Sequence, residues 1–156
     1  MDPRTSIGHV HLKVSDLDRS VEFYTKVLGF DLTTRMGDQA AFLSFGGYHH
    51  HLGLNTWESH GGRPPAPGSV GLYHFAILVP DRKTLARCIK SLNDHEWPIE
   101  GAADHGVSEA VYFSDPDGNG IEIYRDRPKN EWPKDAKGDL AMYTRPLDIQ
   151  GVMKEL

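Results

Sequence analysis

The sequence predicts an α+β protein: two tandem βαβββ modules that form a curled mixed sheet, or cup, with the helices on its outer face. The main observation is a strand-then-helix pattern that occurs twice. Equivalent positions recur at one constant spacing, and they pair His9 with His74, Val14 with Val79, and Asp16 with Asp81. A second observation is that short strands and a glycine turn follow each copy, as a duplicated module requires.

The repeat divides a single domain, residues 1–156, into successive segments. These are module 1 (5–56), a linker (57–70), module 2 (71–126) and a C-terminal tail (127–156). Gly and Pro are concentrated in the linker, and the tail has no strong periodicity. We expect the tail to wrap the body of the protein and to end in a short helix.

Module 1 begins with a strand that leads into a helix. Ser15 or Asp16 can cap that helix, because both residue types accept hydrogen bonds from the first free backbone N–H groups. Gly29 is placed to end it. Helical spacing of the apolar residues supports the assignment, at Leu17, Val21, Tyr24 and Leu28.

Module 2 repeats this beginning. Its strand ends at Pro80-Asp81, where Asp81 is the expected cap of a second helix. The buried stripe of that helix is marked by Leu85, Ile89 and Leu92. Short strands follow over 110–114 and 120–124.

Alternation along each strand predicts which side chains share a face. Ile121 and Ile123 are expected to face the helix, and Glu122 the opposite side. In the segment 49–54, Leu52 and Leu54 face the helix, and the same alternation places His50 with them. The opposite face then collects polar and titratable residues, namely His9, His11, His49, His51, His74, Tyr112 and Glu122.

Composition limits the classes of partner. The net charge is −5 and the basic residues are scattered, which argues against nucleic acid. No apolar run approaches the roughly 20 residues that a bilayer requires, so no membrane partner is expected. A single cysteine excludes an internal disulfide and fits a reducing, cytoplasmic environment.

His9, His74 and Glu122 form a candidate metal-binding set. Two histidines and one carboxylate, with positions left open, are the ligands of non-heme Fe(II) oxygenases. The sequence therefore predicts a divalent metal, with Fe(II) first and Mn(II), Ni(II) and Zn(II) as alternatives.

The duplicated module, with a histidine on each first strand and a glutamate on the last, resembles the vicinal oxygen chelate superfamily. That group includes glyoxalase I, bleomycin-resistance proteins and extradiol ring-cleaving dioxygenases. The segments that carry the resemblance are 9–17, 23–30, His74 and 115–122. The chain is most similar to the N-terminal half of catechol 2,3-dioxygenase-like proteins.

The resemblance implies roles for particular residues. His9, His74 and Glu122 match the family's metal positions. His51 falls at the fourth position of the cup, where family members have either a ligand or a proton-transfer group. Tyr112, ten residues before Glu122, and His105, on the preceding loop, match further catalytic positions of the ring-cleaving dioxygenases.

These features favour an Fe(II)-dependent extradiol-type dioxygenase that acts on a catechol or similar vicinal-oxygen aromatic substrate with O₂. The alternatives are a glyoxalase-type isomerase or lyase, which would use Ni(II) or Zn(II), and a nonenzymatic drug-binding protein. A homodimer is possible, and His9 can meet His74 either within one chain or across such a dimer. His51 stays open between metal ligand and acid/base.

Overall fold

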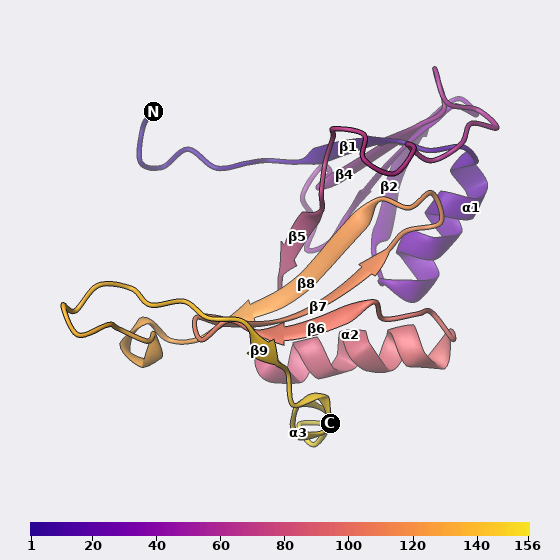
Figure 1. The fold of residues 1–156 in the computed structure, drawn as a ribbon. Coiled ribbons are helices and arrows are strands. Elements are labelled where there is room, and N and C mark those ends of the chain that lie inside the picture. The colour runs from indigo at the N-terminus through magenta and orange to yellow at the C-terminus, as the bar shows by residue number, and fades with distance from the viewer. The chain divides into compact units, whose positions relative to one another are not determined.

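The computed structural model describes all residues from Met1 to Leu156. The chain divides into two compact units. Unit 1 comprises residues 1–70 and 116–118, and unit 2 comprises residues 71–115 and 119–156. Figure 1 labels the helices and strands of both.

Unit 1 contains the first βαβββ module. Its order is β1 (Val10–Lys13), α1 (Leu17–Glu22), the π-helical segment η1 (Phe23–Val27), β2 (Asp31–Met36), β3 (Ala40–Ser44) and β4 (Leu52–Asn55). The strands form one sheet in the order β1-β4-β3-β2. β1 runs parallel to β4, and the other neighbours are antiparallel, so the predicted mixed sheet is confirmed for this module.

The helix of unit 1 begins and ends at residues that the sequence singles out. The Asp16 side chain accepts a hydrogen bond from the Arg19 backbone N–H at 3.0 Å, which makes Asp16 the N-cap. Gly29 follows the helix with φ = 76°, a left-handed conformation that favours glycine. On the sheet, Leu12, Leu43, Leu52 and Leu54 are buried on the side covered by α1.

The turn at 116–118 is held to the start of α1 within unit 1. The Asp117 carboxylate accepts hydrogen bonds from the Ser15 backbone N–H at 3.0 Å and from the Ser15 hydroxyl at 2.5 Å. Arg19 donates to the same carboxylate at 2.6 Å. The Asp117 side chain of this turn thus satisfies the backbone N–H of the residue that precedes the helix cap.

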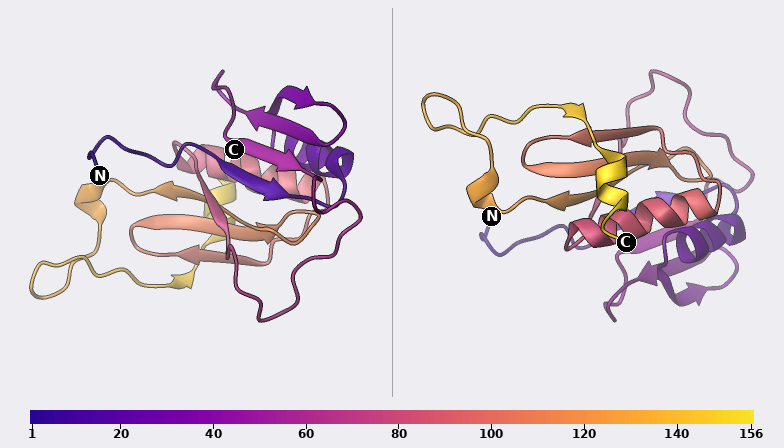
Figure 2. Two further views of the ribbon diagram at one scale, coloured as in Figure 1. Left: turned by 90° about the horizontal axis from the view of Figure 1, so that it is seen from above. Right: turned by 90° about the horizontal axis from the view of Figure 1, so that it is seen from below.

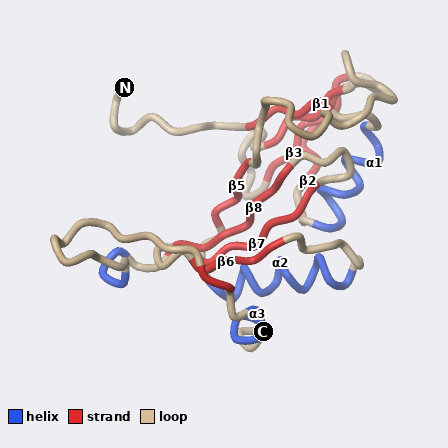
Figure 3. Tube along the Cα trace, viewed as in Figure 1, coloured by secondary structure: helices blue, strands red, loops and turns tan.

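Unit 2 contains the second βαβββ module and the tail. Its elements are β5 (Phe75–Leu78), α2 (Arg82–Asp94), β6 (Gly101–Asp104), β7 (Ser108–Ser114), β8 (Gly120–Asp126), the 3₁₀ turn η2 (Lys129–Glu131), β9 (Arg145–Pro146) and α3 (Ile149–Met153). The sheet order is β5-β8-β7-β6-β9, with β5 parallel to β8. The second module is therefore confirmed, and the tail adds a strand to its edge (Figure 3).

α2 covers one face of this sheet. Asp81 caps it by accepting a hydrogen bond from the Thr84 backbone N–H at 2.7 Å. The predicted stripe Leu85, Ile89 and Leu92 is fully buried. α3 packs against α2, as the view from below in Figure 2 shows, and buries Val152. None of the helices is long and apolar enough to span a bilayer.

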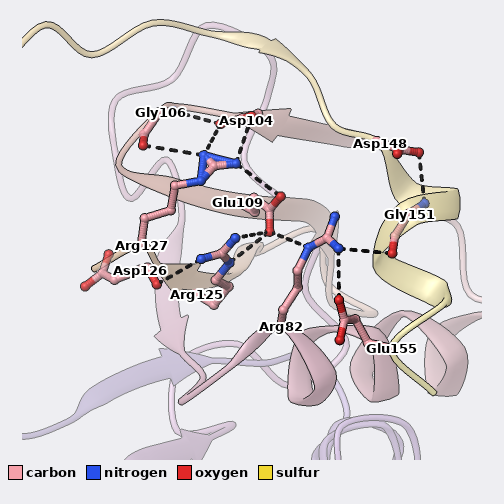
Figure 4. Close-up of polar contacts among 10 residues, drawn as sticks. All are labelled: Arg82, Asp104, Gly106, Glu109, Arg125, Asp126, Arg127, Asp148, Gly151 and Glu155. Carbon is pink, nitrogen blue, oxygen red and sulfur yellow. Dashed lines mark hydrogen bonds and ion pairs between the residues drawn. The ribbon is translucent and has the colours of Figure 1, made fainter. Parts of the chain in front are cut away.

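A buried ion-pair cluster fastens the tail to the sheet (Figure 4). Glu109 on β7 is 4% exposed, and its carboxylate meets Arg125 of β8 at 2.7 Å, Arg82 of α2 at 3.0 Å and Arg127 at 3.2 Å. Arg82 also donates to the Gly151 carbonyl oxygen of α3 at 3.1 Å. One buried carboxylate therefore joins the sheet, α2 and, through Arg82, the C-terminal helix.

Candidate metal and acid–base site

Tyr112 and Glu122 face away from α2 on neighbouring strands. They are direct partners in the β7–β8 register, and Glu122 is also the partner of Ala76 on β5. Their neighbours in sequence are buried on the helix side, with Val111, Phe113, Ile121 and Ile123 all at 2% exposure or less. The predicted alternation is confirmed for both strands.

His74 stands just before β5, beside Glu122. Its Nε2 atom lies 3.0 Å from Glu122 Oε2. The close approach depends on Gly120, because a Cβ atom at that position would collide with the Tyr73 carbonyl oxygen and crowd the His74 side chain. Glycine at the start of β8 thus allows the segment before β5 to lie next to the glutamate.

The His74–Glu122 pair has the donor chemistry of a divalent metal site. Two ligand atoms about 2.0–2.2 Å from a common ion, at right angles to each other, lie about 3 Å apart. The separation of Nε2 and Oε2 fits that geometry. His74 and Glu122 are two of the three residues that the sequence predicts as metal ligands, and their role as ligands stays a prediction.

Tyr112 interacts with the other carboxylate oxygen. Its hydroxyl donates to Glu122 Oε1 at 3.1 Å. Burial, and then the negative charge and hydrogen bond of Glu122, raise the pKa of Tyr112 to about 12. The phenol is therefore a neutral hydrogen-bond donor at physiological pH.

His105 extends this contact by one residue. It lies in the turn between β6 and β7, and its Nε2 atom is 2.7 Å from the Tyr112 hydroxyl oxygen. Unit 2 thus brings together a continuous line of side chains, in the order His105, Tyr112, Glu122 and His74. Such a line can hold a cation at one end and exchange a proton at the other.

The other predicted site residues, His9 and His51, belong to unit 1. His9 precedes β1, and its ring centroid is 4.5 Å from that of His50. The His51 ring stacks on Phe45 at 4.0 Å, and its Nδ1 atom lies 3.1 Å from the Ser44 hydroxyl oxygen. The hypothesis that His9 completes a ligand set with His74 and Glu122 stays a prediction.

The expected orientation of His50 is wrong. Alternation places it with Leu52 on the helix side, but its ring lies against Phe42, 5.1 Å between centroids, and against His9. Phe42 is the register partner of Gly53, on the opposite face from Leu52. The physical reason is that β4 begins at Leu52, so the period of two does not extend back to His50.

His11 packs flat on the same face of unit 1. A Cβ atom on Gly53 would lie 2.8 Å from His11 Nδ1, so glycine at this position makes room for the ring. Phe42 and Trp57 flank it, with centroids at 5.9 and 5.7 Å. Burial, followed by the charge of His9, lowers the pKa of His11 and favours its neutral form.

Sequence reasoning missed Gly120 and the tail residues around His105. In the sequence Gly120 is only one glycine of a turn-rich segment, although its lack of a side chain is what places His74. The Tyr143 carbonyl oxygen and the Thr144 hydroxyl each lie 3.2 Å from His105 Nδ1. Within either unit, no three His, Cys, Asp or Glu side chains form a cluster that could hold a metal ion.

The chain belongs to the Glyoxalase/Bleomycin resistance protein/Dioxygenase superfamily, whose family model matches residues 6–123. The catechol-2,3-dioxygenase of Bacillus subtilis (strain 168) is 44% identical over 151 residues, which cover 97% of this chain and 52% of that protein. The chain thus spans about half the length of that relative.

Two further relatives are of shorter length. The metallothiol transferase FosB of Staphylococcus epidermidis is 30% identical over 122 residues, which cover 77% of this chain and 81% of that protein. The crystal structure of a lactoylglutathione lyase from Agrobacterium tumefaciens matches with a TM-score of 0.62 and 25% identity, covering 80% of this chain and 96% of the other. All of these relatives carry the names of enzymes, but of different reaction types.

Proposed function

We propose that this protein is a metal-dependent enzyme of the extradiol dioxygenase type, which cleaves a catechol or a similar vicinal-oxygen aromatic substrate with O₂. Fe(II) is the metal we favour, with Mn(II), Ni(II) and Zn(II) as alternatives. The name of the Bacillus subtilis relative supports this reaction class, and its 44% identity extends over nearly the whole of this chain.

The observation that carries the proposal is the line of side chains in unit 2. His74 and Glu122 offer a nitrogen and an oxygen 3.0 Å apart, and the two residues beyond them are a phenol and an imidazole. Metal donors next to a hydrogen-bond donor and a base are what ring cleavage of a catechol requires. A chelating substrate needs open metal positions, a proton acceptor and a donor for an anionic oxygen.

We assign the metal to His9, His74 and Glu122. When bound, the metal supplies Lewis acidity toward the substrate hydroxyls and an electronic path to O₂. His105 Nε2 or the imidazole of His51 accepts the proton that the substrate gives up, because a neutral imidazole suits that task near neutral pH. Tyr112, held protonated beside Glu122, donates a hydrogen bond to the substrate oxygen that is left anionic.

Metal analysis and product analysis on protein purified without chelator test this proposal. Iron in the protein together with cleavage of catechol in the presence of O₂ is the expected result. Nickel or zinc, with isomerisation of a hemithioacetal and no ring cleavage, would instead support the glyoxalase-type alternative. Protein without metal that binds planar drugs and turns over neither substrate would support the nonenzymatic alternative.

A further inference from the structure

The tail meets the site at the turn that carries His105. β9 pairs with the outer edge of β6, with Arg145 opposite Asp104. The Tyr143 backbone N–H donates to the His105 carbonyl oxygen at 3.3 Å. The tail therefore contacts the backbone of His105, the candidate base, at the end of β6.

The polarity of the contacts to His105 determines which ring nitrogen bears the proton. Nδ1 lies 3.2 Å from the Tyr143 carbonyl oxygen, which can only accept a hydrogen bond. Nδ1 must therefore carry a hydrogen to bond this oxygen, and the Thr144 hydroxyl, also 3.2 Å from Nδ1, can accept from the same N–H group. In the neutral ring, Nε2 is then unprotonated, and it is the nitrogen that lies 2.7 Å from the Tyr112 hydroxyl.

The tail is pressed closely against this turn. Gly106 is buried with φ = 78°, and a Cβ atom there would lie 2.7 Å from both Pro133 Cγ and Tyr143 Cε1. Arg127, at the start of the tail, also holds the turn, with hydrogen bonds to the Asp104 carboxylate at 2.9 and 3.0 Å (Figure 4). Trp132 in turn donates to the Arg127 carbonyl oxygen at 2.8 Å.

We propose that the tail, through the Tyr143 carbonyl group, is a positioning element that holds His105 in the Nδ1–H tautomer and so directs Nε2 to Tyr112. The proposal deepens the function given above and rests on it for its catalytic meaning. A hydrogen bond from one ring nitrogen to a backbone carbonyl group fixes the working nitrogen of histidines in many catalytic and metal sites.

The tautomer decides where the Tyr112 hydrogen points. With His105 neutral, Nε2 at 2.7 Å and Glu122 Oε1 at 3.1 Å are both acceptors within reach of the single hydrogen of the Tyr112 hydroxyl. When Nε2 takes up a proton, it becomes a donor to the Tyr112 oxygen, and the Tyr112 hydrogen turns to Glu122. When His105 gains a proton, the hydrogen bond between His105 and Tyr112 therefore reverses its direction, and the Tyr112 hydrogen is directed to the Glu122 carboxylate. Tyr112 remains protonated throughout.

The test is the tautomer itself, read from two-bond ¹H–¹⁵N correlation spectra of the full chain labelled at histidine, at a pH where His105 is neutral. The His105 resonances are assigned by their loss in His105→Gln. We expect an Nδ1–H ring in the parent. If the His105 imidazole of the parent is the Nε2–H tautomer, the proposal is wrong, and no variant is needed to show it.

A matched pair of glycine variants tests the role of the tail. Gly106→Ala should push the tail away and give a mixture with substantial Nε2–H tautomer. Gly138→Ala is the control, because Gly138 lies in the same tail with φ = 87° and a Cβ atom there would meet nothing within 4 Å, so the substitution adds backbone strain alone. A folded Gly106→Ala protein that keeps the tautomer of the parent contradicts the proposal.

The same spectra separate this inference from the proposed function. An Nδ1–H ring in the parent, lost only in Gly106→Ala, supports the positioning role whatever reaction the protein catalyses. Failure of the parent to cleave catechol counts against the dioxygenase assignment and leaves the tautomer result standing.

Discussion

The Tyr112 hydroxyl lies 3.1 Å from Glu122 Oε1, on directly paired positions of β7 and β8. Tyr112 and His74 therefore contact the same carboxylate, since the second oxygen of Glu122, Oε2, is 3.0 Å from His74 Nε2. A cation that binds at His74 and Glu122 must change the pKa of Tyr112, because the Glu122 carboxylate contacts both His74 and Tyr112. The ionisation of Tyr112 is thus a reporter of the site.

Tyr112 should titrate above the ordinary tyrosine range in metal-free protein and at lower pH once metal is bound. Its pKa, raised to about 12 by burial and by Glu122, should fall when a divalent cation neutralises that carboxylate. An ordinary unfolded-state value is about 10, so its contribution to stability is complete below about pH 10 and is lost as pH rises through about 12. Tyrosinate absorbance of the parent minus that of Tyr112→Phe, with and without metal, measures both effects. A Tyr112 that titrates near 10 without metal contradicts this account.

His74→Ala should lose bound metal and keep its fold. The side chain contributes one donor of the pair with Glu122, and it lies outside the buried stripe that α2 covers. The metal-to-protein ratio and the circular dichroism spectrum check the two halves of the prediction. His95→Ala is the control, since His95 is exposed at the C-terminal end of α2. If His74→Ala holds metal as well as the parent does, His74 is not a ligand.

The faces of the strands could be predicted because alternation is strict wherever a strand is continuous. Ile121, Glu122 and Ile123 lie as expected for this reason. His50 does not, because it precedes the first residue of β4 and alternation has no force outside a strand. The helix caps Asp16 and Asp81 and the stop at Gly29 were also predictable, since each depends on local hydrogen bonding or on φ alone.

The environment of His105 could not be predicted from the sequence. The contact between His105 and Tyr143 joins residues 38 positions apart, and the tail that supplies it has no periodic pattern. The role of Gly120 could not be predicted for a different reason. The sequence shows a glycine there, but it does not show that the backbone of Tyr73 and His74 packs against it. Both features are set by tertiary packing.

Glu109→Gln should destabilise the protein by about 3–5 kcal/mol, the usual cost of removing one partner from a buried ion pair. Burial acts to raise the pKa of Glu109, but hydrogen bonds from Arg125 and Arg82 outweigh it and the pKa is lowered. The carboxylate therefore contributes stability above about pH 4.3, its ordinary range, and this is lost as the pH falls through its lower folded-state pKa. Urea unfolding at a series of pH values should show the parent and the variant converging in acid.

The control for Glu109 is Glu58→Gln. The side chains of Glu58 and its partner Lys13 are 78% and 65% exposed, and Lys13 Nζ lies 3.6 Å from Glu58 Oε2. Such surface pairs contribute about 0–1 kcal/mol. Equal destabilisation by the two substitutions would show that the cluster around Glu109 does not stabilise the fold.

His51→Gln should distinguish a metal ligand from an acid/base. The His51 ring is stacked on Phe45 and its Nδ1 atom meets the Ser44 hydroxyl, so Nε2 is the nitrogen left for chemistry. Three protein ligands leave a metal open to a chelating substrate, whereas a fourth would crowd it, and we therefore expect a base. The variant should then keep its metal and bind substrate, while turnover falls by roughly 10²–10⁴.

If His51 is a ligand instead, His51→Gln should lose metal as expected for His74→Ala. The control is His60→Gln, because His60 lies in an exposed turn of unit 1. Full metal content with unchanged turnover would exclude both roles and leave His51 as a packing residue between Phe45 and Tyr48.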